Sequence, residues 1–133
     1  MRLPDWEERL ADVIAAYQGG VFVWGQRDCF RLPVDVARAV AGLVLWADVR
    51  PYRTARGAAV RLARHGFRGV GGALAAVLEE VPPALARRGD VGVVLEQGAE
   101  AGVVVLGTEI AGMAPAGMTI VPRERLWRAF RVG

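Results

Sequence analysis

The sequence contains no serine, lysine or asparagine, and it has one cysteine, Cys29, and one histidine, His65. The missing serine excludes a Ser-His-Asp triad, and the missing lysine excludes a Schiff base and a Walker-type phosphate lysine. Without asparagine there is no Cys-His-Asn set either. A structural zinc site usually needs four Cys or His ligands. We therefore expect no cofactor and no such metal site, although composition alone leaves open a carboxylate site for magnesium or calcium.

Long uninterrupted apolar runs are also missing. Charged residues break the two longest runs, 34–49 and 91–107, so neither can cross the roughly 30 Å hydrocarbon core of a bilayer. The N-terminal residues predict a capped amphipathic helix rather than an apolar leader. We expect no membrane span and a protein that is made in the cytoplasm, to be kept there or packaged from there.

The first half of the chain has the pattern of four helices. Asp5 and Glu8 match a capping box, and the helix that follows ends at Gly19-Gly20. After a short extended segment and a turn at Gly25, Asp28 can cap a second helix that holds Cys29. Pro33 must then either lie in the first turn of that helix or kink it. Two further helices are expected at 55–65, capped by Thr54 and closed by Gly66, and after the glycines at 69–72, through Leu78.

The second half of the chain has the pattern of short strands. Residues 91–95 and 102–106 form a predicted hairpin with a turn at Gln97-Gly98, and two more strands are expected near 118–121 and 127–132. The fold class is therefore α+β, with N-terminal helices packed on a small C-terminal antiparallel sheet. The length of 133 residues fits a single domain over 1–133, with a helical half at about 4–80 and a sheet half at about 88–132.

Cys29 lies in the stretch 22–30, which leads into the second predicted helix. A thiol at a helix N-terminus lies near unsatisfied N–H groups and the positive end of the helix dipole, which favour the reactive thiolate. Catalysis would also need a base to take the thiol proton. The alternative interpretation is that Cys29 is a small buried apolar residue, because free cysteine is among the most buried residue types.

Three short motifs appear in a characteristic order: Trp24-Gly25 with Asp28-Cys29, then Gly89-Asp90 before an apolar strand, then the strand 102–107. This order resembles that of the NlpC-type, papain-like cysteine peptidases, in which W-G…D-C carries the nucleophile and H-V-G carries the catalytic histidine. The chain also resembles a family of uncharacterised bacterial and phage proteins found near phage-like tail genes. The resemblance implies a papain-like fold and a possible place in a virion or phage-like particle.

The resemblance places Cys29 on the nucleophile, with Phe30 where the family usually has serine. Aligning Gly102 with the glycine of H-V-G puts Glu100 at the histidine position, or Ala101 if the hairpin is shifted by one residue. A glutamate with an ordinary pKa near 4.3 is a weak base at neutral pH. His65 is the other candidate base, but at the end of a predicted helix it can instead interact with the helix dipole.

The third predicted helix has a basic face. Arg53, Arg56, Arg61 and Arg64 share one arc of the helix, and no acidic residue occurs from Arg50 to Arg68. The arc is either a solvated surface or a docking face for an anionic partner. No helix-turn-helix, zinc-finger or RNA-binding motif accompanies it, so we expect no specific nucleic-acid binding.

Two hypotheses of function follow. In the first, the chain is a non-catalytic, NlpC-like structural or assembly component, for example of a phage or gene-transfer-agent-like tail tip. Its partners are then other protein subunits such as tail proteins, and Trp46 and Trp127 are expected to be exposed contact residues. In the second, it is an active cysteine hydrolase that cleaves peptide or amide bonds of cell-wall peptides. Cys29 is then the nucleophile, His65 or Glu100 the base, and nearby backbone N–H groups form the oxyanion hole.

Overall fold

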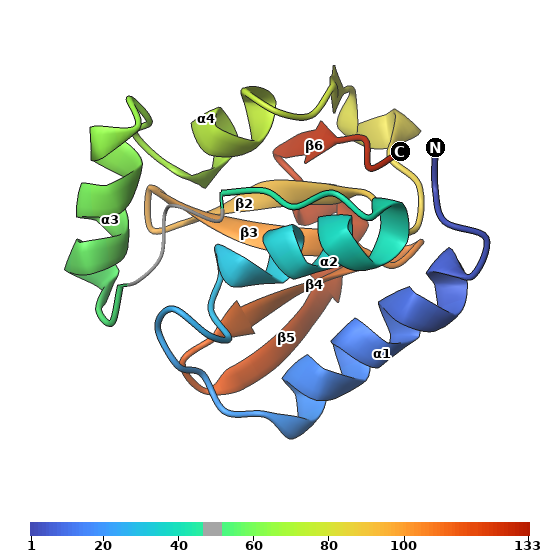
Figure 1. The fold of residues 1–133 in the computed structure, drawn as a ribbon, viewed down its shortest axis with the longest axis horizontal. Helices are drawn as coiled ribbons and strands as arrows, with labels where there is room; N and C mark the ends of the chain where they lie inside the picture. Colours follow the sequence, from blue (N-terminus) through green and yellow to red (C-terminus); the bar gives the residue numbers. More distant parts are fainter. Residues whose placement is uncertain (47–51) are drawn as a thin grey trace.

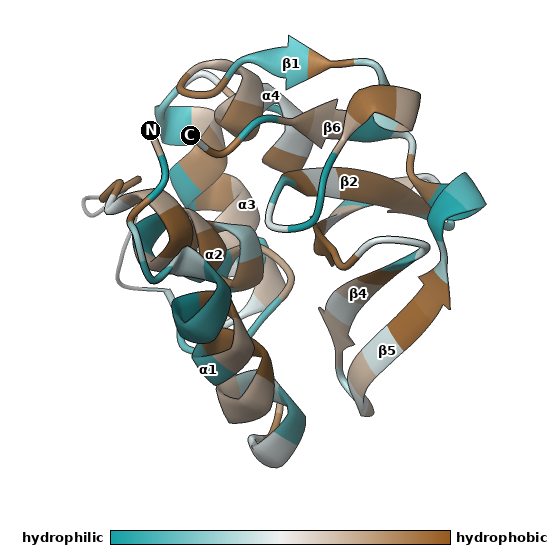
Figure 2. Cartoon of the chain, turned by 90° about the vertical axis from the view of Figure 1, so that its right-hand side faces the viewer, coloured by the Kyte–Doolittle hydropathy of each residue, from teal (hydrophilic) through white to brown (hydrophobic). Residues whose placement is uncertain are grey.

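In the computed structural model, which describes residues 1–46 and 52–133, four α-helices precede the strands of a single antiparallel sheet. The helices are α1 (Trp6–Gly19), α2 (Arg31–Ala41), α3 (Ala55–Arg64) and α4 (Val70–Ala75). Helix α2 crosses the sheet, α1 lies beside α2, α3 stands at the left next to the ends of β2 and β3, and α4 packs on β2, β3 and β6 (Figure 1). The turned view shows α1 and α2 on one side of the sheet (Figure 2). The predicted α+β class is confirmed.

The sheet has six strands in the order β1-β6-β2-β3-β4-β5, and every neighbouring pair is antiparallel. The strands are β1 (Glu80–Val81), β2 (Val91–Glu96), β3 (Ala99–Val105), β4 (Glu109–Ala114), β5 (Gly117–Pro122) and β6 (Arg128–Phe130). The predicted β2–β3 hairpin is confirmed, with positive φ at both Gln97 (52°) and Gly98 (81°) of its turn. The prediction of four strands was wrong, because β1 and β4 carry no strong strand pattern and depend on pairing with β6, β3 and β5.

Of the predicted helix caps at Thr54 and Asp5, the first forms and the second does not. Thr54 caps α3 as expected, because its hydroxyl accepts a hydrogen bond of 2.9 Å from the N–H of Gly57. The capping box at Asp5 does not form. The Asp5 carboxylate instead accepts a 2.9 Å hydrogen bond from Nε of Arg9, one turn along the same helix. An exposed arginine four residues away thus takes the place of the backbone N–H groups.

Helix α2 begins at Arg31, two residues after Cys29, so the prediction that the helix holds Cys29 was wrong. Pro33 lies in the first turn, as predicted, where its missing N–H costs no helical hydrogen bond. Leu32, Val36 and Val40 are fully buried, and together they form a ridge with i, i+4 spacing. This ridge packs α2 on the centre of the sheet and thereby fixes the position of the Cys29 turn that precedes the helix.

Apolar side chains cover both faces of the sheet. The larger core lies between the helices and the sheet and includes Val91, Val93 and Phe130. A smaller core lies on the other face and is completed by residues from the segments between strands, such as Ala86 and Leu126. Because both faces are buried, β2 reads as a continuous apolar run rather than an alternating one.

Among residues 1–46 and 52–133, no helix combines the length and apolar character that a membrane crossing requires.

Candidate functional site

The turn that carries Cys29 is organised by the carboxylate of Asp28. This side chain is fully buried and accepts four hydrogen bonds. Its Oδ1 binds the N–H groups of Phe30 (2.9 Å) and Arg31 (2.7 Å), and its Oδ2 binds the N–H of Gly25 (2.8 Å) and the hydroxyl of Tyr52 (2.7 Å). A buried carboxylate needs such donors to offset its lost hydration. Asp28 therefore binds the N–H of Arg31, the first residue of α2, although Phe30 holds the N-cap position, and it ties this turn to the chain at positions 25 and 52.

Two neighbours of Asp28 explain the local sequence. Gly25 has φ +85°, and a Cβ there would collide with the carbonyl oxygen of Tyr52. Burial, together with the charge and the hydrogen bond of Asp28, raises the pKa of Tyr52, so its hydroxyl stays a donor. Gly25 and Asp28 of the Trp-Gly…Asp-Cys motif are thus explained by the geometry of the turn, whatever the chemistry of the cysteine.

The surroundings of Cys29 disfavour its thiolate. Burial and the negative charge of Asp28 raise its pKa from 9.0 to about 11, against the opposite effect of the backbone N–H groups of Cys29 and Gly102. The helix N-terminus therefore does not lower the pKa of this thiol to favour the thiolate. The N–H groups that would favour it, those of Phe30 and Arg31, are bound to Asp28 instead.

A cavity of about 420 Å³ opens beside Cys29. Strands β3 and β4 pair only from Val103↔Gly112 to Val105↔Ile110, so the tips of the β2–β3 and β4–β5 hairpins are not paired with each other. The cavity lies between these tips and the segment before α2. Its walls are mainly apolar, and its lining residues include Phe22, Trp24, Val94, Val103, Met113 and Val121, with Cys29, Glu96, Gln97 and Thr119 as polar groups.

Glu100, the first candidate base, is used elsewhere. Its Oε1 accepts a 3.0 Å hydrogen bond from the N–H of Gly71 in the first turn of α4. Glycines at 69 and 71 leave room for this carboxylate, which a Cβ at either position would strike. Glu100 does not line the cavity beside Cys29. Its observed role is to join β3 to α4.

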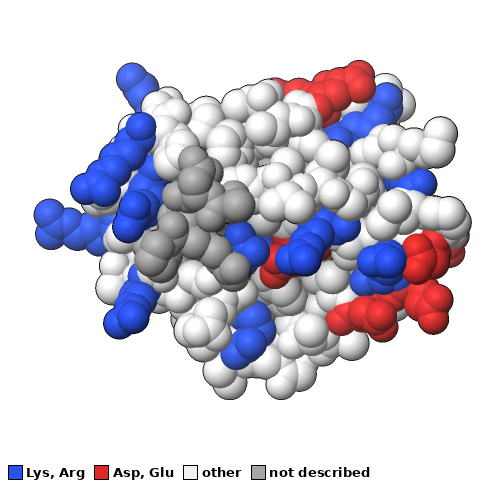
Figure 3. All heavy atoms as spheres, viewed as in Figure 1, with Lys and Arg blue, Asp and Glu red and all other residues white. Residues whose placement is uncertain are grey.

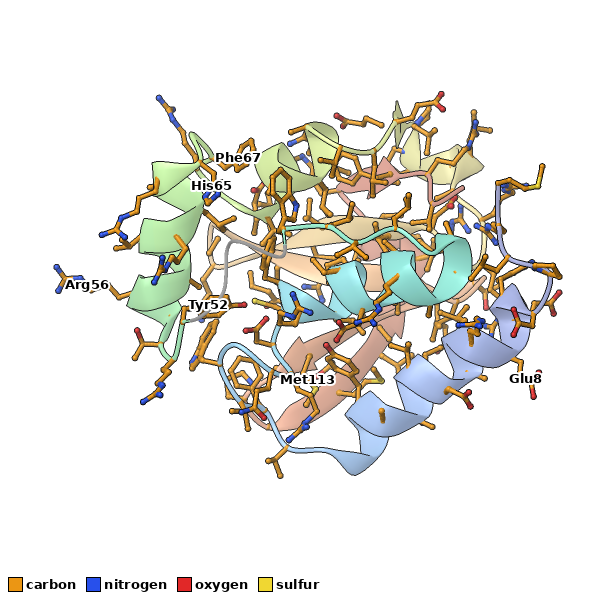
Figure 4. The ribbon with its side chains drawn as sticks, viewed as in Figure 1. Glu8, Tyr52, Arg56, His65, Phe67 and Met113 are labelled. Carbon is orange, nitrogen blue, oxygen red and sulfur yellow. The ribbon has the colours of Figure 1, made fainter. Side chains whose placement is uncertain are left out.

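His65, the second candidate base, is the C-cap residue of α3. Its Nδ1 lies 2.9 Å from the carbonyl oxygen of Arg61, and its ring meets the Trp46 ring edge-on at a centroid distance of 6.3 Å. Figure 4 shows His65 at one end of α3 and well apart from Met113, which lines the cavity beside Cys29. The structure therefore brings neither candidate base to the wall of this cavity.

A family model described as "Domain of unknown function (DUF6950)" matches residues 1–132. The chain belongs to this family. The predicted likeness to an uncharacterised family is thereby confirmed, whereas the likeness to NlpC-type peptidases remains a prediction. No curated protein matches the chain.

In this DUF6950 chain the Gly89-Asp90 motif connects the two termini. Asp90 is fully buried and accepts hydrogen bonds from the N–H of Val132 (3.0 Å), the N–H of Arg87 (2.8 Å) and the guanidinium of Arg2 (2.9 Å). Gly89 has φ +92°, in the left-handed region that favours glycine. The motif is explained by this structural role.

The predicted basic face is present, although Arg53 lies just before α3 rather than in it. Arg53, Arg56 and Arg64 are exposed and Arg61 is half-buried. They cover one end of the DUF6950 molecule (Figure 3). None of these four forms an ion pair with any residue of 1–46 or 52–133. Arg50, at the start of the basic stretch, lies outside the described residues.

The two tryptophans expected on the surface differ from each other. Trp127 is 48% exposed, as predicted. Trp46 is half-buried and packs edge-on against Phe67 at a centroid distance of 5.1 Å, so the prediction of an exposed Trp46 was wrong.

In the described part of the chain, no three His, Cys, Asp or Glu side chains gather where they could hold a metal ion.

Proposed function

We propose that this protein is a non-catalytic, NlpC-like domain that binds other protein subunits as a structural or assembly component of a larger particle, such as the tail tip of a phage or gene-transfer-agent-like particle. The state of Cys29 carries the proposal. Its thiol has a pKa of about 11, and the two residues considered as bases are engaged with Gly71 and Arg61. A cysteine nucleophile needs the opposite arrangement, with a lowered pKa or an adjacent base.

Two further observations support a binding role. The basic face of α3 is exposed and forms no ion pair with other described residues, as expected of a surface that meets a charged partner. Asp28 and Asp90 match motifs of the NlpC-type peptidases, and the hydrogen bonds described above for both carboxylates support the fold. The particle itself is inferred from the likeness of motifs, and fold does not fix function.

The second candidate function is hydrolysis of peptide or amide bonds in cell-wall peptides by Cys29. The cavity of about 420 Å³ favours it, because a ligand placed there would lie against the thiol. This volume is within the range of about 300–1,000 Å³ that small-molecule sites occupy. The Gly102 N–H that acts on the sulfur could then also stabilise an oxyanion.

The rate of Cys29 alkylation by iodoacetamide, measured against pH, distinguishes the two functions. We expect the folded protein to react slowly at pH 7, with the rate rising toward pH 11. The unfolded chain in denaturant is the control and should show the ordinary thiol pKa near 9.0.

Faster labelling of the folded chain than of the unfolded chain at pH 7 would contradict the non-catalytic assignment. So would turnover of a cell-wall peptide that disappears in Cys29→Ala.

A further inference from the structure

The molecule has a basic end and an acidic end on opposite sides. Arg56 on α3 and Glu8 on α1 point outward at opposite ends of the molecule (Figure 4). The basic side chains gather over α3, and acidic side chains gather near the start of α1 (Figure 3). Each end is formed by the solvent-facing surface of one helix.

On α3 the outward surface contains the ridge Arg56, Val60 and Arg64, which have i, i+4, i+8 spacing and are all exposed. Val60 is 41% exposed, although it is a large apolar residue in the middle of a helix. Only Ala58 and Leu62 of this helix are buried. An apolar residue flanked by charged ones matches the arrangement of a small protein–protein contact, which has an apolar centre and a polar rim.

On α1 the outward surface contains Glu7, Glu8 and Asp12, and all three are exposed. None of them forms an ion pair with any residue in the described part of the chain, whereas their neighbour Arg9 is paired with Asp5. Ala11 and Ala15, on the same helix, are exposed as well. Small side chains beside carboxylates leave space for a close approach of another helix.

We propose that these two surfaces bind each other between copies of the chain, with α3 of one copy packed on α1 of the next. Arginines at 56 and 64 then meet carboxylates at 7, 8 and 12, and Val60 packs among the alanines. A head-to-tail contact of this kind is heterologous, so it builds a ring or a filament rather than a closed two-fold dimer. This inference rests on the assembly role proposed above, and it identifies one partner in that assembly as a second copy of the chain.

The occupant is a second copy rather than a nucleic acid for two reasons. A charged phosphate backbone would make no favourable contact with the exposed apolar side chain of Val60 at the centre of the ridge. The net charge is only +3, and the acidic end would repel a long polyanion, whereas a second copy supplies a surface of matching charge.

Sedimentation of the full chain at low and high salt is the first test. We expect a weight-average mass above the monomer mass of 14.3 kDa at about 20 mM salt, returning toward the monomer value at about 500 mM salt. A chain that stays monomeric at both salt concentrations and at high protein concentration overturns the proposal. So does a chain that stays monomeric but binds nucleic acid through the α3 arginines.

Two charge-reversed variants give a sharper test. R56E/R64E loses the basic surface and E7R/E8R loses the acidic one, so each alone should self-associate at least about tenfold more weakly. One variant is then acidic at both surfaces and the other is basic at both, so mixing them restores opposite charges at each α3–α1 contact and should restore association. No complex on mixing overturns the proposal, provided that circular dichroism shows both variants folded.

R87E/R125E is the matched control, because it reverses two exposed arginines outside α3. It should associate like the unchanged chain, and equal weakening by this control would overturn the proposal in favour of a net-charge effect. The outcome is separate from that of the alkylation experiment: a monomeric chain with an unreactive Cys29 contradicts this inference alone.

Discussion

At the scale of single residues, Asp28 shows how one side chain determines both a local structure and a chemical state. Its carboxylate accepts hydrogen bonds from the N–H groups of Phe30 and Arg31 at the start of α2. Burial raises the pKa of the neighbouring Cys29 thiol, and the same negative charge of Asp28 raises it further. A residue in a peptidase-like motif therefore supports the fold while it disfavours the thiolate.

The raised pKa of Cys29 predicts a specific loss of stability in alkali. Because the pKa is about 11 in the folded chain and 9.0 when unperturbed, the thiol contributes stability below pH 9 that is lost as the pH rises through 11. The expected loss is about 2–3 kcal/mol in the free energy of unfolding. Denaturant titration of the protein between pH 8 and 11 measures it.

Cys29→Ala is the control for this measurement. Tyr17 and Tyr52 also have raised pKa values and remain in the variant, so the difference between the two pH profiles isolates the thiol. Parallel profiles for the two proteins would show that the thiol titrates normally in the folded state.

At the scale of elements, the close approach of the Cys29 turn to β3 fixes how the helical layer sits on the sheet. A Cβ at position 102 would collide with the carbonyl oxygen of Cys29 and with the ring of Pro33. Only a glycine at this point of β3 lets the two segments come so close. This contact also places the thiol at the wall of the cavity.

Gly102→Ala should therefore destabilise the fold by about 1–3 kcal/mol, because the turn or the strand must move to accept the methyl group. Gly19→Ala is the matched control. It lies in α1 with no heavy atom within 4 Å of the added Cβ, so it should be neutral or stabilising by up to about 1 kcal/mol. Thermal and urea unfolding of both variants test this, and equal stability of the two would contradict the packing argument.

At the scale of the whole molecule, Arg2 connects the two ends of the chain. Its guanidinium binds the carboxylate of Asp90 at 2.9 Å and the carbonyl oxygens of Arg88 and Val132 at 2.7 and 3.0 Å. It also lies over the ring of Trp6, 4.3 Å from the centroid. The termini lie side by side as a result (Figure 1).

Arg2→Ala should lower the free energy of unfolding by about 2–4 kcal/mol, because it leaves the fully buried carboxylate of Asp90 without its cation. Arg9→Ala is the comparison, since the Arg9–Asp5 pair is exposed and should contribute less than about 0.5 kcal/mol. Denaturant unfolding at neutral pH measures both, and similar losses would contradict a special role for the Arg2–Asp90 pair.

The sequence by itself determined the local features. The cap at Thr54, the turn at Gln97-Gly98, the position of Pro33 and the α+β order follow from propensities and spacing over a few residues, and the structure confirms them. The side-by-side placement of α1 and α2 on the sheet and the two extra strands do not follow from such patterns, because strand pairing depends on partners distant in the chain.

Only the tertiary structure decided the chemistry of the candidate site. Whether Cys29 is a thiolate depends on burial and on where the charge of Asp28 lies. Whether Glu100 or His65 could act as a base depends on their engagement with Gly71 and Arg61. Protonation follows from three-dimensional surroundings rather than from residue type, so the motif alone predicted a possible nucleophile, whereas the surroundings of Cys29 in the fold raise the pKa of its thiol.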